Sequence, residues 1–119
     1  MVNLETVSLD KTFFALADPT RRALLARLGG AERLSVSELA RPFPMTLPAV
    51  MKHLNVLSDA GLVTREKRGR VTECQLSPAP MNDAVQWLEQ HRRFWSEGLD
   101  RLAALVEADG SGGDETHGV

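Results

Sequence analysis

Apolar residues recur along the chain at spacings that predict a mainly α-helical fold with one small β-hairpin. Residues 46–60 form one helical segment, because Val50, Leu54 and Leu57 follow a four-then-three spacing that places them on one buried stripe. Residues 62–76 differ, because two β-prone runs meet there at a glycine-containing turn, which predicts a pair of strands. We expect about five helices and this two-stranded hairpin.

The two central helices carry local signals at their ends. Ser35 and Glu38 have the spacing of a capping box, in which two side chains reciprocally satisfy exposed backbone N–H groups. They predict a short helix that starts at Ser35 and that Pro42 ends. Thr46 is the expected N-cap of the second helix, and Gly61 ends it. Two short helices joined by a proline-bearing turn are typical of a helix-turn-helix, and the following hairpin makes the predicted fold a winged helix.

The outer face of the second of these helices is suited to DNA. It carries no acidic residue before Asp59, and a carboxylate beside phosphates would be repelled. The hairpin tip is basic, with only Glu66 opposing it. A solvated tip that prevents edge pairing is the alternative, but after a helix-turn-helix a phosphate or minor-groove contact is favoured. The predicted DNA-binding residues are Ser35, Thr46, Leu47, Pro48, Met51, Lys52, His53, Asn55, Arg65, Lys67, Arg68 and Arg70.

Charge is unevenly distributed along the sequence. The whole chain is slightly acidic, with a net charge of −2. Residues 41–70 nevertheless hold six Lys or Arg against two Asp or Glu, whereas the remainder holds eight against fourteen. A local basic field on an acidic body steers DNA to one face of a protein and keeps it off the other.

Together these motifs make the chain similar to the ArsR/SmtB (arsenic-repressor-like) transcriptional regulators. The stretches that carry the resemblance are Asp18–Arg22, Leu24–Leu28, Ser37–Ala40, Ala49–Leu57, Ala60–Val63 and Arg68–Arg70. The resemblance covers about Val7 to Val106 and implies a dimeric winged-helix repressor. We therefore expect a homodimer on a palindromic operator, with the recognition helix, 46–60, in the major groove and the wing, 62–76, on the backbone or in the minor groove.

Two positions depart from the pattern of this family, and a third matches it. Many members have polar residues where this chain has Leu47 and Met51, at positions that commonly reach base edges. Apolar side chains there would suit thymine methyl groups, or would simply widen the buried stripe. His53 matches the family's histidine, which often touches the phosphate backbone. The alternative for His53 is a side chain packed on the flank of the helix.

Metal ligands are missing where the family would place them. The helix from Ser35 to Arg41 has no Cys or His, and the last helix offers Asp83 and His91, eight residues apart, without a second His to complete a ligand set. The resemblance therefore points to the subgroup without a metal site, which is often encoded beside small-molecule-binding partner proteins. We expect no metal and no cofactor. Cys74 is the only cysteine, which excludes an intramolecular disulfide. A half-buried inert thiol is expected, with activation by nearby arginines as the alternative.

The last helix, about residues 80–108, has more apolar surface than one small domain needs. A heptad alternation runs along residues 81–106, and a second stripe of Trp87, His91 and Phe94 lies beside it. The expected partner is the same helix of a second subunit. A helix that wraps its own core is the alternative, but it would leave aromatic surface exposed. The predicted dimer-interface residues are Val7, Phe14, Met81, Val85, Leu88, Trp95, Leu99, Leu102 and Val106.

Length and composition fit one DNA-binding and dimerisation domain, residues 1–108. The Gly-, Ser- and acid-rich tail, residues 109–119, is expected to be disordered. The sequence shows neither a membrane-spanning apolar run nor a secretion signal, and it has a single cysteine, so we expect a cytoplasmic protein without a membrane partner.

The sequence does not predict an enzyme, because its histidines fall on separate elements and no P-loop or GxGxxG stretch is present. The alternative to a DNA-binding regulator is a winged helix used for protein–protein interaction with little DNA affinity, against which the basic wing argues. The expected partners are double-stranded DNA and a second copy of the chain. The inducer is left open between a small molecule, a partner protein and a thiol modification.

Overall fold

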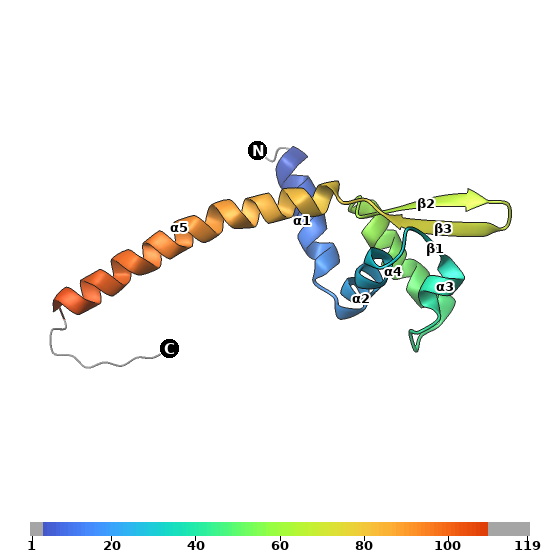
Figure 1. Cartoon of the computed structure of the whole chain (residues 1–119), viewed down its shortest axis with the longest axis horizontal. Coiled ribbons are helices and arrows are strands. Elements are labelled where there is room, and N and C mark those ends of the chain that lie inside the picture. The colour runs from blue at the N-terminus through green and yellow to red at the C-terminus, as the bar shows by residue number, and fades with distance from the viewer. Residues whose placement is uncertain (1–3, 110–119) are drawn as a thin grey trace. The chain divides into compact units, whose positions relative to one another are not determined.

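The computed structural model describes residues 4–109, which form two compact units, one through Ala84 and one from Val85 (Figure 1). The predicted tail therefore lies, apart from Asp109, outside the described residues. The elements in chain order are α1 (Leu4–Leu16), α2 (Pro19–Gly29), β1 (Leu34–Ser35), α3 (Val36–Ala40), α4 (Leu47–Asp59), β2 (Val63–Arg68), β3 (Val71–Leu76) and α5 (Ala79–Asp109). This order confirms the predicted winged helix-turn-helix.

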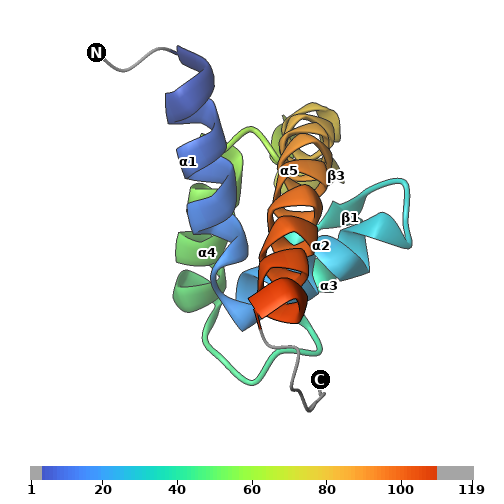
Figure 2. The ribbon, with the colours of Figure 1, turned by 90° about the vertical axis from the view of Figure 1, so that its left-hand side faces the viewer.

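The first unit is built around one apolar core. The predicted stripe of Val50, Leu54 and Leu57 is fully buried, and Leu24 from α2 and Leu39 from α3 join it in the same cluster. Full burial of such a side chain contributes about 1.5–3 kcal/mol. α1 lies beside α4 and contacts α2 as well (Figure 2). The core therefore fixes α4 against three other helices.

Hydrogen bonds confirm the predicted starts of the two central helices, at Ser35 and Thr46, and the predicted end of the second helix at Gly61. The Oγ of Ser35 accepts from the backbone N–H of Glu38 at 3.1 Å, and the Glu38 carboxylate accepts from the N–H of Ser35 at 2.9 Å. The Oγ1 of Thr46 accepts from the third residue of its helix at 3.3 Å. After α4, Gly61 has a φ of +76°. The N–H of Leu62 then donates back to the Leu57 carbonyl at 3.0 Å, which completes a Schellman motif.

The wing belongs to a three-stranded antiparallel sheet with the order β1-β3-β2. The third strand, β1, was not predicted, because two residues cannot show an alternating pattern. Its pairing of Leu34 with Cys74 places β3 in the middle of the sheet. The strands β2 and β3 are joined by a two-residue turn in which Gly69 has a φ of +66°. A glycine at the first central position is what a tight hairpin of this kind requires.

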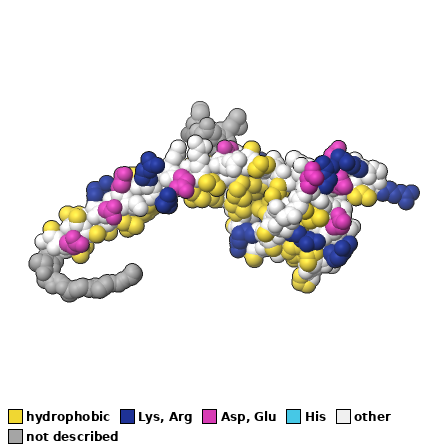
Figure 3. All heavy atoms as spheres, viewed as in Figure 1, with side chains coloured by type: hydrophobic (Ala, Val, Ile, Leu, Met, Phe, Trp, Pro, Cys, Tyr) yellow, Lys and Arg dark blue, Asp and Glu magenta, His cyan; other side chains and the backbone are white. Residues whose placement is uncertain are grey.

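The second unit is the major part of α5, a helix of 31 residues that begins in the first unit. Most of its large apolar side chains are exposed in the single chain, and hydrophobic groups line one side of the helix (Figure 3). The exposed apolar residues of this unit are Val85, Trp87, Leu88, Phe94, Trp95, Leu99, Leu102, Leu105 and Val106. No helix in residues 4–109 is long and apolar enough to cross a membrane.

Candidate nucleic-acid interface

Most predicted DNA-binding side chains of α4 are accessible. Lys52 and Asn55 are exposed, as are Thr46 and Pro48 at the start of the helix. Leu47 keeps 49% of its surface exposed. Met51 behaves differently, because it is half-buried and packs against the core cluster. Of the two alternatives for these apolar residues, an outward position fits Leu47, whereas Met51 also widens the buried stripe.

The wing and α4 are joined by one direct hydrogen bond. Nη1 of Arg65 in β2 donates to Oδ1 of Asn55 in α4 at 2.8 Å. Both residues were predicted to bind DNA, and the structure brings them together. The bond therefore identifies which face of the hairpin lies toward the recognition helix.

The strand register sorts the wing residues onto two faces. One face holds Val63, Arg65, Lys67, Thr72, Cys74 and Leu76. The other face holds Thr64, Glu66, Arg68, Val71, Glu73 and Gln75. Since Arg65 bonds to Asn55, the first face is the one on the side of α4. The two acidic residues of the wing, Glu66 and Glu73, both lie on the second face, so the charged residues on the face toward the recognition helix, Arg65 and Lys67, are both basic.

The hairpin tip has more acidic residues near it than the sequence indicated, where Glu66 was the only one expected to oppose its basic residues. Glu73 pairs with Glu66 across the strands, and Arg68 lies between their carboxylates, at 3.4 Å from Glu66 and 3.5 Å from Glu73. Arg33 also pairs with Glu73 at 3.4 Å. Within residues 4–109, neither Lys67 nor Arg70 forms an ion pair. Lys and Arg side chains, in dark blue, occupy the far end of the hairpin in Figure 3.

A hollow of about 420 Å³ separates the start of α4 from the wing. Its lining residues are Ser35, Val36, Ser37, Leu47, Met51, Arg70, Val71 and Thr72. Sequence reasoning missed Ser37, Thr72 and Val71, the last of which is 47% exposed. Ser35 was predicted to bind DNA, and its side chain is already used as the cap of α3. The β-prone pattern of the wing predicted its strands but gave no sign of which wing residues line this hollow.

His53 does not stand free on the surface of α4. Its Nδ1 atom lies 3.3 Å from Nη1 of Arg21 and 3.7 Å from Oδ2 of Asp18, and its side chain is 23% exposed. Arg21 itself was not predicted as a site residue, because a residue in the first turns of α2 carries no sequence signal for contact with α4. These contacts place His53 on the flank of α4 and involve its Nδ1 alone, so a phosphate contact through Nε2 stays a prediction.

Asp18 is the N-cap of α2 in this cluster. The hydrogen bond from the backbone N–H of Arg21, 3.0 Å from Oδ2, lowers the pKa of Asp18 below its usual 3.8. The nearby charges of His53 and Arg21 act in the same direction, and partial desolvation opposes them. Asp18 is therefore a carboxylate at neutral pH, as a helix N-terminus favours.

Cys74 is fully buried in the central strand of the sheet. Burial raises the pKa of its thiol above 9.0, and the charge of Arg65 offsets this only in part. The expected inert thiol therefore fits the structure better than the reactive one, although Cys74 is more deeply buried than predicted.

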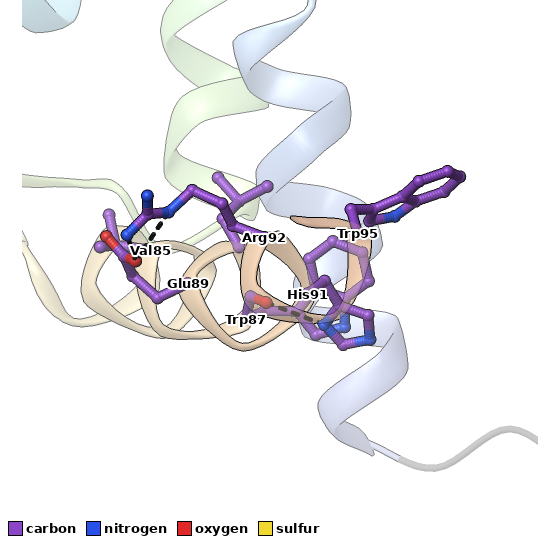
Figure 4. Close-up of a pocket in the computed structure, with 7 residues that line it drawn as sticks. Val85, Trp87, Glu89, His91, Arg92 and Trp95 are labelled. Atoms are coloured by element: carbon purple, nitrogen blue, oxygen red, sulfur yellow. Dashed lines mark hydrogen bonds and ion pairs between the residues drawn. The ribbon is translucent and has the colours of Figure 1, made fainter. Parts of the chain in front are cut away.

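Neither unit brings metal-ligand side chains together within residues 4–109, where no group of three or more His, Cys, Asp or Glu is placed to hold an ion. His91 is instead stacked on Trp87, with 4.0 Å between the ring centroids, and its Nδ1 lies 2.9 Å from the Trp87 carbonyl oxygen (Figure 4). These rings line an apolar hollow of about 360 Å³ on α5, together with Trp95 and the ion-paired Arg92 and Glu89. The predicted absence of a metal remains a prediction.

Comparison with known proteins agrees with this geometry. Residues 16–66 match a family described as a helix-turn-helix domain. The chain is 40% identical over 103 residues to the HTH-type transcriptional regulator Rv2034 of Mycobacterium tuberculosis, covering 87% of this chain and 92% of that protein. It is 28% identical over 80 residues to the transcriptional repressor SdpR of Bacillus subtilis, covering 67% of this chain and 88% of that repressor.

Solved structures give the same result. A crystal structure of an ArsR family transcriptional regulator is 42% identical, with a TM-score of 0.73, and the match covers 81% of this chain and 97% of that one. An ArsR-like regulator from Rhodococcus sp. RHA1 is 36% identical, with a TM-score of 0.69, and the match covers 86% and 92% of the two chains. This chain belongs to the ArsR family of DNA-binding winged-helix transcriptional regulators, which are not enzymes.

Proposed function

We propose that this regulator is a homodimeric, cytoplasmic repressor that binds a palindromic operator in double-stranded DNA. The recognition helix α4 enters the major groove, and the wing contacts the backbone or the minor groove. Residues 1–108 supply both DNA binding and dimerisation. The observation that carries the proposal is the one-sided charge of the wing, whose face beside α4 presents Lys67 without an acidic partner in the described chain.

The proposed major-groove face consists of the accessible side chains of α4. Leu47 and Lys52 are exposed there, and Met51 keeps part of its surface accessible. An apolar side chain discriminates bases by contact with the thymine methyl group, whereas a lysine beside it contacts phosphate or guanine. This division assigns sequence preference to Leu47 and Met51 and general affinity to the basic residues.

The homodimer is supported by apolar surface that the single chain leaves uncovered. Trp95 is 66% exposed, Leu99 59% and Phe14 63%, which is unusual for such large apolar residues. Because α5 presents Trp95 and Leu99 at heptad spacing, a second α5 provides a matching surface. Met81 is the exception among the predicted interface residues, since it packs against the core of its own chain.

Footprinting on the promoter of its own gene tests the proposal. We expect two protected half-sites about 10–10.5 bp apart, related by two-fold symmetry. Affinity should fall steeply with salt, because basic residues release counterions from the DNA. A variant that lacks both Lys67 and Arg70 is the matched control and should bind with a shallower salt dependence. A footprint without symmetry, or binding indifferent to salt, would favour the protein-interaction alternative instead.

A further inference from the structure

Arg21 is a buried charged residue, only 9% exposed, and its guanidinium bonds to groups other than carboxylates. Its Nε donates to the carbonyl of Ala15 at 2.8 Å, and its Nη2 donates to the carbonyl of Phe14 at 3.0 Å. Both carbonyls belong to the last turn of α1, and that of Phe14 also accepts from the backbone N–H of Ala17 at 3.1 Å. The guanidinium carbon also lies 5.2 Å from the centre of the Phe14 ring. These contacts leave the rigid guanidinium fork a single orientation.

The third guanidinium nitrogen of Arg21, Nη1, determines which ring nitrogen of His53 carries the proton. Nη1 of Arg21 lies 3.3 Å from Nδ1 of His53. A guanidinium can only donate hydrogen bonds, so Nδ1 must be the acceptor. In the neutral imidazole the proton then resides on Nε2. Asp18 does not compete for the Nδ1 position, because its Oδ2 lies 3.7 Å from Nδ1, which is longer than a hydrogen bond.

The N–H group of Nε2 is left as an unused donor. Within residues 4–109 Nδ1 is the only ring atom of His53 with a hydrogen bond, and the side chain remains 23% exposed. His53 follows the exposed Lys52 on α4. A donor beside a lysine on a recognition helix is suited to the non-bridging oxygens of a DNA phosphate.

We propose that Arg21 is a positioning residue for DNA binding, which holds His53 as the Nε2–H tautomer so that this N–H donates to a phosphate of the operator backbone. The proposal rests on the proposed function, since it needs DNA on the α4 face. It adds a role for a residue of α2 that never has to touch DNA itself. The single side chain of Arg21 thereby holds the end of α1, orients the ring of His53 and positions the donor for one phosphate contact.

The tautomer can be measured on the free protein by long-range ¹⁵N–¹H NMR of the histidine rings at pH 8, with His53 assigned by the His53→Gln variant. We expect the Nε2–H pattern for His53. His91 is an internal reference, because its Nδ1 faces a carbonyl oxygen at 2.9 Å and must carry the proton there. In Arg21→Met the His53 signal should become a mixture of tautomers. An Nδ1–H or a charged His53 in the unmodified protein would overturn the proposal.

DNA binding provides the second readout. His53→Met should weaken operator binding about tenfold, the effect of removing one charge-assisted hydrogen bond. His53→Gln should retain most of the affinity, because its amide N–H can reach a similar position. Arg21→Lys keeps the charge but not the fork. It should weaken binding about as much as His53→Met, and should have little further effect when the two are combined.

The matched control is Arg22→Lys on the same helix, since the Arg22 guanidinium donates to the exposed carbonyl of Leu16 and not toward His53. It should leave both the His53 tautomer and DNA affinity unchanged. Thermal unfolding of each variant separates loss of fold from loss of binding. If the unmodified protein binds its operator and His53→Met binds equally well, this inference is wrong while the proposed function stands. If the unmodified protein does not bind DNA at all, the proposed function itself is overturned.

Discussion

Arg65 of the wing and Asn55 of the recognition helix share a 2.8 Å hydrogen bond, so the two parts of the candidate DNA interface are mechanically joined. The bond lies on the solvent side and contributes little to global stability, about 0.5–1.5 kcal/mol at most. Its consequence is geometric, because it couples the angle of the hairpin to α4.

We expect Asn55→Ala and Arg65→Ala to weaken operator binding non-additively, since either change breaks the same link. The coupling in a double-mutant cycle should be about 0.5–1.5 kcal/mol. Asn55→Asp is a sharper variant, because it keeps a partner for Arg65 but places a carboxylate on the DNA-facing sector. It should bind DNA less well than Asn55→Ala. Strictly additive losses, or tighter binding by Asn55→Asp, would contradict this coupling.

The basic residues of the wing should differ in their effect on DNA binding. Lys67→Ala or Arg70→Ala should each weaken binding to all sequences similarly and reduce the salt slope by about 0.9 for each phosphate that the side chain neutralises. Arg68→Ala should do less, because Glu66 and Glu73 already neutralise that guanidinium at 3.4 and 3.5 Å. Affinity measured at several salt concentrations gives the slopes.

Glu73→Gln is the complementary variant for the wing. It removes the carboxylate that pairs with both Arg33 and Arg68, and it should therefore strengthen DNA binding modestly and steepen the salt dependence. If Arg68→Ala proves as damaging as Arg70→Ala, the ion pairs do not restrain Arg68 when DNA is bound.

Local signals in the sequence were sufficient for most of the fold. The capping box at Ser35 and Glu38 and the glycine after α4 act through neighbours in sequence, so their geometry follows from residue type and spacing. The strand β1 could not be predicted, because its pairing with β3 joins residues about forty positions apart, Leu34 and Cys74. A two-residue strand exists only because that tertiary pairing supplies its partner.

The candidate site was less predictable than the fold for the same reason. Helical angles placed Pro48, Lys52 and Asn55 opposite the buried stripe, and these residues are exposed. Contacts between elements were beyond such reasoning, including the packing of Arg21 against His53 and the position of Glu73 beside Arg68. Such contacts depend on how the helices and the sheet are placed, which no local pattern encodes.

The thiol of Cys74 should be unreactive in the folded protein. Burial raises its pKa above 9.0, so at pH 8 the folded state holds less thiolate than the unfolded state. Its reaction with a disulfide reagent should be much slower than that of a free thiol, and urea should restore the normal rate. Cys74→Ala should leave DNA binding unchanged. A fast reaction in the native protein would contradict the assignment and restore thiol modification as a signal.

The exposed face of α5 should control assembly. Trp95→Ala removes an aromatic anchor of the proposed seam, a kind of change that commonly costs ~2 kcal/mol or more at an interface. Sedimentation should then show more monomer, with weaker operator binding at low protein concentration. Gln90→Ala on the polar side of the same helix is the matched control and should leave the dimer intact. A wild-type protein that is monomeric at micromolar concentration would refute the homodimer.

DNA release should not respond to zinc, cadmium, nickel or arsenite. Transition metals in proteins are held by several thiolate, imidazole or carboxylate ligands, and the described chain gathers no three of these in one place. The lone thiol is buried, and the ring of His91 is stacked on Trp87 with its Nδ1 against a carbonyl. Each metal can be titrated into a labelled operator complex while fluorescence anisotropy is followed. We expect no change at stoichiometric metal.

A chelator supplies the control for this titration, because it separates specific release from precipitation by excess metal. A stoichiometric loss of DNA binding that the chelator reverses would overturn the prediction. The first ligands to replace would then be Asp83 and His91 on α5, followed by His117, which lies outside the described residues. Loss of the metal response in His91→Ala would locate the site on α5, where the ring would have to leave its stack on Trp87 to bind the ion.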